Sequence, residues 1–264
     1  MTIKYENCKD MKSRIQHELN EIEKNYNIKI IYACESGSRA WGFASSDSDY
    51  DVRFIYTHPK DWYLTIAEKR DVIENPLDGD LDINGWDIRK SLILLRKSNS
   101  PLLEWISSPI KYRNVKQKMN VFVELSAVAF LPESSCYHYL SMAKNIISNF
   151  DDGEVVKIKS YLYSLRTILC CKWIIMRLNQ PPMKIQDLLK EFLPIGELRE
   201  IVDNLIYVKS GGTESAKIKR SLQFEEYLKD QLNFLETKIP KNPKKIPIEK
   251  FDSVFQEILL GSNT

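Results

Sequence analysis

The sequence predicts an α+β protein in which a small mixed-sheet domain, residues 1–120, precedes a helical bundle domain, residues 121–264. Segments with the β-branched composition of strands fall between residues 28 and 88. After residue 88 the apolar residues recur at three- and four-residue steps, which is the periodicity of helices. A chain of 264 residues is long enough for one large domain or two ordinary ones.

The first half of the chain predicts one helix followed by four strands. Residues 9–27 form an amphipathic helical pattern with four apolar residues on one face: Met11, Ile15, Leu19 and Ile22. Residues 28–34 are a short apolar run typical of a buried strand, and residues 50–57 alternate as a second strand. Two further strands are expected within residues 71–88, around a turn at residues 76–80 that contains the Asp-Gly pair favoured in turns.

The second half predicts helices almost throughout. Residues 154–178 are apolar on most sides, which indicates the central helix of a bundle. Three more helical patterns cover residues 183–193, 196–210 and 214–238, and a glycine pair separates the last two. The lysine- and proline-rich residues 238–250 are expected to form an exposed linker before a final short helix.

Composition excludes several classes of protein. Apolar residues make up 43% and charged residues 28%, as in soluble globular proteins, and the net charge is only +2. Five cysteines without a C-x-x-C pair and three widely spaced histidines argue for a reduced chain without a zinc site. No apolar run reaches the ~20 residues that span a bilayer. We therefore expect no membrane partner, and we expect a cytoplasmic location. The oligomeric state is not indicated.

The stretch ESGSRAWGFASSDSDYDVRFIY, residues 35–56, carries the chemistry. Asp49 and Asp51 are two residues apart, so in a strand they face the same side. Two carboxylates this close are costly unless a cation lies between them, and oxygen ligands suit Mg²⁺, with Mn²⁺ as the alternative ion. The third acid of a metal site is expected to be Asp87, with Asp82 as the fallback. On strict alternation these two face opposite ways.

The Gly-Ser turn before this strand suits phosphate binding. Gly37 lets the backbone approach a ligand, and Ser38 is expected to hydrogen-bond a β- or γ-phosphate oxygen, although it can equally cap a helix. Arg39 is grouped with them as a nucleotide-binding residue. Arg53 shares the face of the two aspartates, where it neutralises them or contacts a phosphate. Glu35 is expected to brace the turn.

A polar stripe runs along the apolar helix of residues 154–178. Lys159, Tyr163 and Arg166 lie at four- and three-residue steps, hence on one face. A buried charge needs a partner, so the stripe either forms internal salt bridges or lines the active site and grips nucleotide phosphates. The lysines of residues 238–250 are the other feature dense enough to suggest a polyanion.

Several of these segments together resemble a known family. The stretch at residues 35–56, GWDIRKSLILLRKSNSPLLEWISSPI, KIKSYLYSLRTILCCKWI, Pro181-Pro182 and YVKSGGTES are similar to the polymerase-β-like nucleotidyltransferase superfamily, and within it to the RlaP-like predicted nucleotidyltransferases associated with RNA repair. The resemblance covers most of residues 30–215. It implies a polymerase-β-like catalytic domain and metal-dependent nucleotidyl transfer, with Asp49, Asp51 and Asp87 as metal ligands.

The expected function is therefore transfer of a nucleoside monophosphate from a nucleoside triphosphate, here taken to be ATP or another NTP, to an acceptor hydroxyl with release of pyrophosphate. An RNA 3′ end is the first expectation for the acceptor, followed by a protein hydroxyl and a small molecule. The contrasting hypothesis is a non-catalytic RNA-binding module that has kept the fold. The three acids and the Gly-Ser turn argue against that hypothesis.

Overall fold

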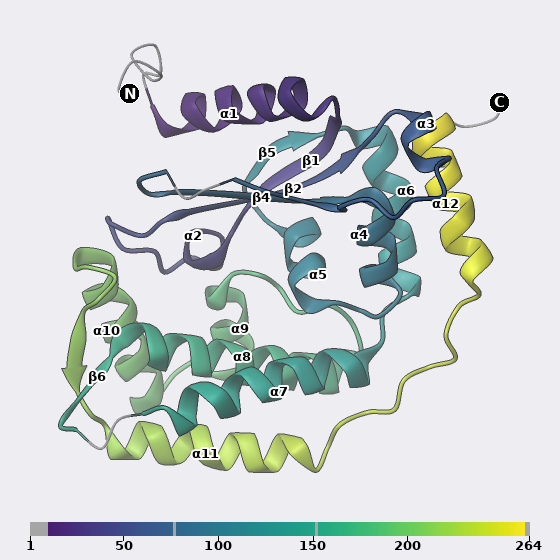
Figure 1. The fold of residues 1–264 in the computed structure, drawn as a ribbon. Helices are drawn as coiled ribbons and strands as arrows, with labels where there is room; N and C mark the ends of the chain where they lie inside the picture. The colour runs from purple at the N-terminus through teal and green to yellow at the C-terminus, as the bar shows by residue number, and fades with distance from the viewer. Residues whose placement is uncertain (1–9, 76–77, 151–152, 262–264) are drawn as a thin grey trace.

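The computed structural model describes residues 10–75, 78–150 and 153–261, and it has the expected α+β fold. A five-stranded mixed sheet carries helix α1 (Met11–Tyr26) on one face and most of the other helices on its opposite side (Figure 1). Most of the helix-rich second half of the chain lies below that opposite side. It also contributes a separate two-stranded sheet.

The five-stranded sheet is formed by β1 (Lys29–Ser36), β2 (Tyr50–Thr57), β3 (Val72–Glu74), β4 (Leu81–Asp87) and β5 (Lys111–Asn114), in the order β3-β4-β2-β1-β5. β2 and β4 are parallel, and the other neighbouring pairs are antiparallel. Four of these strands were predicted. β5 was not, because its residues KYRN are polar and only partly buried at the edge of the sheet. The turn expected at residues 76–80 includes positions 76 and 77, which lie outside the described residues.

Helix α1 covers one face of the sheet as its apolar periodicity predicts. Its N-cap Asp10 accepts a hydrogen bond from the Ser13 N–H at 2.7 Å. Its buried residues Ile15, Leu19 and Ile22 pack in one apolar cluster with residues of β1, β2, β3 and β4. The residues of β2 that alternate away from this cluster, among them Asp51 and Arg53, therefore face the other side of the sheet.

The opposite face carries α2 (Gly37–Trp41), α4 (Ile88–Leu95) and α5 (Ser100–Ser107), with α3 (Lys60–Tyr63) and α6 (Lys116–Val128) at its end. The apolar cluster on this face continues without a break into the second half of the chain. It joins Ile55 of β2 to Leu165 in the middle of the longest helix. This face of the sheet and the helical half therefore share one core.

The second half is formed by α7 (Pro132–Ser148), β6 (Val155–Lys157), α8 (Ile158–Arg177), α9 (Ile185–Phe192), α10 (Glu197–Gly211), β7 (Lys217–Lys219) and α11 (Leu222–Glu236). α8 is the central helix, as predicted. Two expected helices start later than the periodicity indicated, because residues 155–157 and 217–219 pair as an antiparallel β-ribbon instead. Within the described ranges no helix, α8 included, is long and apolar enough to cross a membrane.

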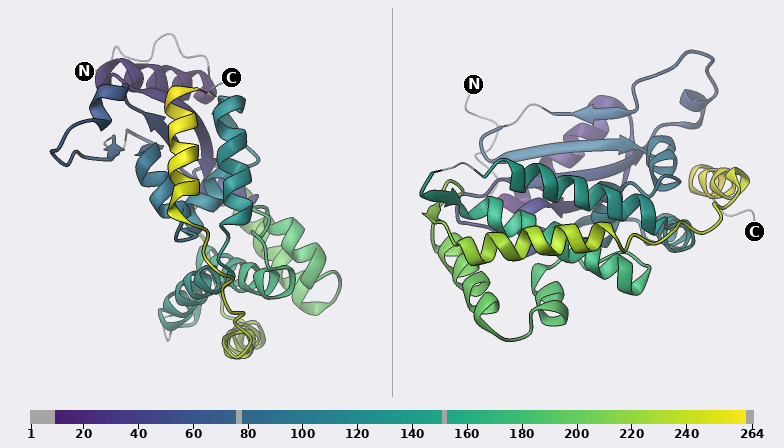
Figure 2. Two further views of the ribbon diagram at one scale, coloured as in Figure 1. Left: turned by 90° about the vertical axis from the view of Figure 1, so that its right-hand side faces the viewer. Right: turned by 90° about the horizontal axis from the view of Figure 1, so that it is seen from below.

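The last helix, α12 (Ile248–Leu260), returns to the first half of the chain and packs against α6 and α4. Figure 2 shows α12 running alongside α6. The linker connects it to α11, which lies apart from it. The expected boundary between residues 120 and 121 falls inside α6. The division into two domains stays a prediction, and any such division would group α12 in space with the sheet.

Candidate active site

The turn between β1 and α2 lies against the side chain of Asp51. Gly37 opens α2 with a φ of +64°, a left-handed conformation that glycine adopts without strain. A Cβ at this position would lie 2.1 Å from Asp51 Oδ2. Position 37 therefore needs glycine for its backbone and for its contact with the carboxylate. Ser38 follows as a buried residue whose carbonyl accepts hydrogen bonds from the N–H groups of Gly42 and Phe43.

Glu35 braces the turn from β1. Its side chain is fully buried, and Oε1 accepts a hydrogen bond from the Asp51 backbone N–H at 2.8 Å. Oε2 accepts a hydrogen bond from the Tyr112 hydroxyl. Burial raises the pKa of Glu35, and these two hydrogen bonds oppose the rise. Glu35 thus positions the strand that carries Asp51 and does not itself face the site.

Asp82 is the acid of β4 that lies beside Asp51. The two residues are directly paired in the parallel register of β2 and β4, so their side chains share one face of the sheet. Arg53 bridges them, donating to Asp51 Oδ1 at 3.0 Å and to Asp82 Oδ2 at 2.7 Å. Burial raises the pKa of Asp51, the Arg53 charge opposes the rise, and the charges of Asp82 and Asp49 add to it. Asp49, Asp51 and Asp82 are termed the acidic cluster.

Arg39 shapes the loop that presents Asp49. Its Nε donates to the Asp49 carbonyl at 3.1 Å, and its NH2 donates to the Ser48 carbonyl at 2.5 Å. The guanidinium also lies over the Tyr50 ring, 3.7 Å from the centroid. Arg39 was predicted to bind nucleotide, whereas the structure directs its donors to the backbone around Asp49. The Asp49 side chain itself is exposed.

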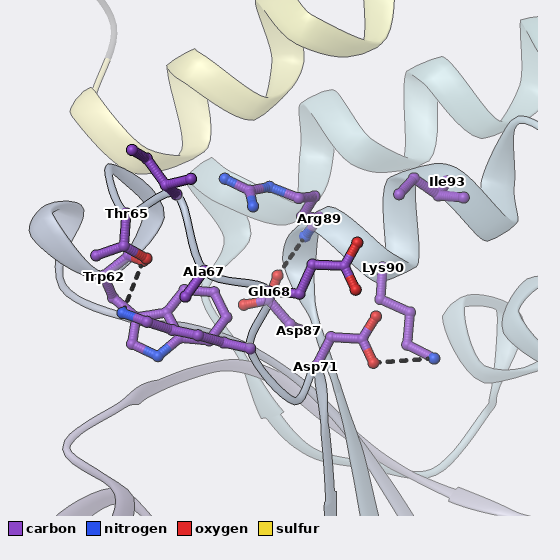
Figure 3. A pocket seen from close by; sticks show the side chains of 11 residues that line it. Trp62, Thr65, Ala67, Glu68, Asp71, Asp87, Arg89, Lys90 and Ile93 are labelled. Carbon is purple, nitrogen blue, oxygen red and sulfur yellow. Dashed lines mark hydrogen bonds and ion pairs between the residues drawn. The ribbon is translucent and has the colours of Figure 1, made fainter.

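Asp87 does not join the acidic cluster, so its expected role as the third metal ligand is wrong on geometry. It pairs in register with Tyr56, five residues beyond Asp82 along a strand without a bulge, which is ~16 Å away. Asp87 caps α4 by accepting from the Arg89 N–H at 2.7 Å, and it accepts from the Tyr63 hydroxyl at 2.6 Å. It borders a separate pocket of about 390 Å³ at the far end of the strands (Figure 3).

The first turns of α8 form a wall facing the acidic cluster. The positive charge of Lys159 acts to lower the pKa of Asp51, and the negative charge of Asp51 acts to raise the pKa of Tyr163. Lys159 Nζ also lies 5.3 Å from the centroid of the Tyr163 ring. That ring packs edge-on against Trp41 of α2 at 4.9 Å. The structure thus brings two of the three residues of the predicted stripe to the site.

The third residue of the stripe, Arg166, points elsewhere. Its side chain is only 3% exposed, and its NH1 pairs with Glu104 Oε1 at 2.9 Å. Its other nitrogens donate to the Met183 carbonyl at 3.3 Å, and its guanidinium lies 4.4 Å from the centroid of the Trp41 ring. Arg166 is therefore engaged in a buried ion pair between α8 and α5. This arrangement contradicts its predicted contact with nucleotide and matches the internal salt bridge that was the alternative.

Glu214 is a site residue that the sequence reasoning missed. Its Oε1 pairs with Lys159 Nζ at 2.6 Å, and its Oε2 pairs with Lys209 Nζ at 2.6 Å. Oε2 also accepts from the hydroxyls of Ser45 and Ser48 in the loop before Asp49. Burial acts to raise the pKa of Glu214, but these hydrogen bonds outweigh it and hold the pKa at about 2. The available signal was the KSGGTES string, which had been noted only as part of the family resemblance.

The acidic cluster fits a hard cation in the chemistry of its donors. Three carboxylates of adjacent segments offer the oxygen ligands that Mg²⁺ prefers. Within the described residues, however, no three His, Cys, Asp or Glu side chains already form a metal-ligand set. Arg53 instead supplies positive charge between Asp51 and Asp82. A cation at this site would share the two carboxylates with Arg53.

Comparison with known proteins agrees with the sequence resemblance. Residues 11–257 match the model of a family described as the RNA repair pathway DNA polymerase beta family, RlaP. The chain is 45% identical over 257 residues to the uncharacterized protein YcgL of Bacillus subtilis (strain 168), covering 96% of each chain. A solved structure described as a nucleotidyltransferase-like protein from Exiguobacterium sibiricum aligns with 95% of this chain and 81% of its own, at 12% identity and a TM-score of 0.29.

Proposed function

The chain belongs to the RNA repair pathway DNA polymerase beta family, and on this premise we propose that it transfers a nucleoside monophosphate from a nucleoside triphosphate to an acceptor hydroxyl. The observation that carries the proposal is the contact between the Gly37 turn and Asp51, with Asp82 paired beside it. A purely structural strand has no need for two paired carboxylates, because like charges side by side destabilise it.

Asp49, Asp51 and Asp82 would hold Mg²⁺ or Mn²⁺. The bound ion would supply positive charge that offsets the negative charge developing on the transferred phosphoryl group. Gly37 lies against Asp51, and it and the following Ser38 would leave room for the distal phosphates. Lys159, on the opposite wall, is placed to pair with a phosphate oxygen in exchange for part of its contact with Glu214.

The bond changes occur between the two substrates, and groups of this chain position them. The acceptor hydroxyl oxygen forms a bond to the α-phosphorus, the bond from that phosphorus to the bridging oxygen breaks, and pyrophosphate leaves. The hydroxyl proton passes to Asp82, which thereby acts as the general base. Arg53 keeps Asp82 and Asp51 in place, so catalysis depends chiefly on orientation and charge.

An RNA 3′ end is the acceptor we propose first, because the family is described by an RNA repair pathway. A protein hydroxyl and a small molecule follow in that order. These alternatives differ in the molecule that receives the nucleotide. The reaction at the α-phosphorus is the same for each. A module that binds RNA without catalysis would bind acceptor but release no pyrophosphate.

The test is incubation of the full chain with each α-labelled nucleoside triphosphate and total RNA, with Mg²⁺ or Mn²⁺ added. We expect label in RNA and release of pyrophosphate, both abolished in the double variant of Asp49→Asn and Asp51→Asn. Asp230→Asn, on the exposed face of α11, is the matched control because it removes one carboxylate far from the site. Wild-type turnover by the double variant would refute the assignment.

A further inference from the structure

The β-ribbon formed by β6 and β7 carries three lysines on its outer face. Lys157 pairs with Lys217 and Val155 with Lys219, whereas Val156 pairs with Ile218. Paired residues of an antiparallel ladder share a face and successive residues alternate. The Val156 side of the ribbon is buried, and Lys157, Lys217 and Lys219 are exposed on the other. Three ammonium groups therefore project from one small surface.

Among the described residues, the ribbon lysines lack the salt bridges that neighbouring cations form. Lys159 pairs with Glu214, and Arg220 pairs with Glu225 at 2.5 Å. None of the three ribbon lysines forms a salt bridge with a residue inside the described ranges. Three like charges held on adjacent strands repel one another, so this face is electrostatically suited to a polyanion.

The ribbon continues directly into the candidate active site. Lys157 is two residues before Lys159 of the α8 wall, a step of ~7 Å. The Ile158 N–H donates to the Ala216 carbonyl at 3.0 Å, which ties the start of α8 to the segment between Glu214 and β7. Glu214 in turn contacts the loop before Asp49. Figure 1 shows β6 on the same side of the molecule as α2.

The other lysine-rich segment, the linker of residues 238–250, is placed differently. Figure 1 shows the chain between α11 and α12 climbing the side of the molecule opposite to β6. Lys241 of this segment already pairs with Glu133 at 3.3 Å. The linker is thus remote from the acidic cluster, and the ribbon is the basic surface that adjoins it.

We propose that the outer face of the β6–β7 ribbon binds the phosphate backbone of a single-stranded RNA acceptor and directs its 3′ end toward the acidic cluster. The inference rests on the proposed function and names the class of its acceptor. Charge complementarity indicates this ligand, because three projecting lysines can contact the phosphates of an RNA strand. Such contacts do not depend on the base sequence.

The test compares two triple variants that remove the same charge. Lys157→Gln, Lys217→Gln and Lys219→Gln alter the ribbon, and Lys244→Gln, Lys245→Gln and Lys250→Gln alter the linker region. Affinity for a labelled single-stranded RNA is measured by fluorescence anisotropy across a salt series. The ribbon variant should bind more weakly, with a log–log salt slope shallower by about 2, from ~0.7 for each phosphate that the variant no longer neutralises. The linker variant should match wild type.

Further readouts separate this inference from the proposed function. Triphosphate affinity should be unchanged in the ribbon variant, and replacing the same three lysines with arginine should restore RNA binding. Equal loss of RNA affinity in the two Gln variants would overturn the inference, because removing any three positive charges would then weaken RNA binding to the same extent. Absence of RNA binding by wild type would also overturn it, whereas pyrophosphate release with a non-RNA acceptor would leave the nucleotidyltransferase proposal standing.

Discussion

Replacing Asp82 and Asp87 one at a time with alanine should separate catalysis from stability. The two acids are on the same strand, but Asp82 pairs with Asp51 and Asp87 caps α4. Asp82→Ala removes the proposed general base of the acidic cluster, so we expect nucleotidyl transfer to fall by at least about 10²-fold, the lower end of what general base catalysis contributes. Asp87→Ala should leave the rate of the folded enzyme nearly unchanged.

The stability effects should have the opposite ranking. Asp87→Ala removes the helix cap, worth about 0.5–2 kcal/mol, and leaves the Tyr63 hydroxyl, in a residue 9% exposed, without its acceptor, worth about 1–3 kcal/mol. The sum is about 1.5–5 kcal/mol. Asp82 is 30% exposed, and Arg53 keeps its contact with Asp51 when Asp82 is replaced. Asp82→Ala should therefore cost less than about 1 kcal/mol.

Two measurements check this prediction: urea unfolding for the free energy, and initial rates of pyrophosphate release at a temperature where both variants are folded. Asp87→Asn is a useful second variant, because an asparagine oxygen can still cap the helix. A large loss of turnover in Asp87→Asn with unchanged stability would refute the reasoning. Wild-type turnover by Asp82→Ala would remove Asp82 from the site.

Three further predictions follow from other buried or charged groups. Arg166→Ala should lower the free energy of unfolding by about 3–5 kcal/mol, because it leaves the buried Glu104 carboxylate without its cationic partner, while triphosphate affinity measured by calorimetry stays the same. Glu214→Gln should slow nucleotidyl transfer, because it weakens the contacts that hold Lys159 and the loop of Ser48 beside the acidic cluster. Since the wild-type pKa of about 2 lies below the usual 4.5, the stability that Glu214 contributes is present above pH 4.5 and disappears toward pH 2, so thermal melts of the two proteins should converge in acid. Burial, with the charge of Lys69, lowers the pKa of His58 to about 4, so wild-type stability should fall between pH 6.5 and 4. His58→Phe should remove that dependence and keep the stacking on Trp62; an unchanged pH profile would contradict it.

Local pattern was sufficient for the elements whose partners are near in sequence. The amphipathic stripe of α1 and the strand, turn and strand from β1 to β2 were all predicted from residues within one or two turns of one another. The same alternation correctly placed Asp51 and Arg53 on one face of β2. It also implied that Asp82 and Asp87 face opposite ways, which the unbroken register of β2 and β4 bears out.

The choice between Asp82 and Asp87 could not be made in this way. β2 and β4 are separated by 23 residues and run parallel, so no tight turn sets their register. Only the register shows that Asp51 lies beside Asp82. The same limit applies to the ribbon of β6 and β7, whose strands of three residues each are too short to show a period.

The sequence by itself determined the fold class, the turn of Gly37 and the shared face of Asp51 and Arg53, because backbone periodicity and glycine conformation are local properties. Only the tertiary structure decided which charges reach that site. Lys159 and Arg166 are both basic residues of one polar stripe on α8. Lys159 faces the acidic cluster, whereas Arg166 is buried against Glu104. The partner of a charged side chain depends on which distant segment packs over it. That packing is a property of the whole folded core, and a charge that it buries needs a partner.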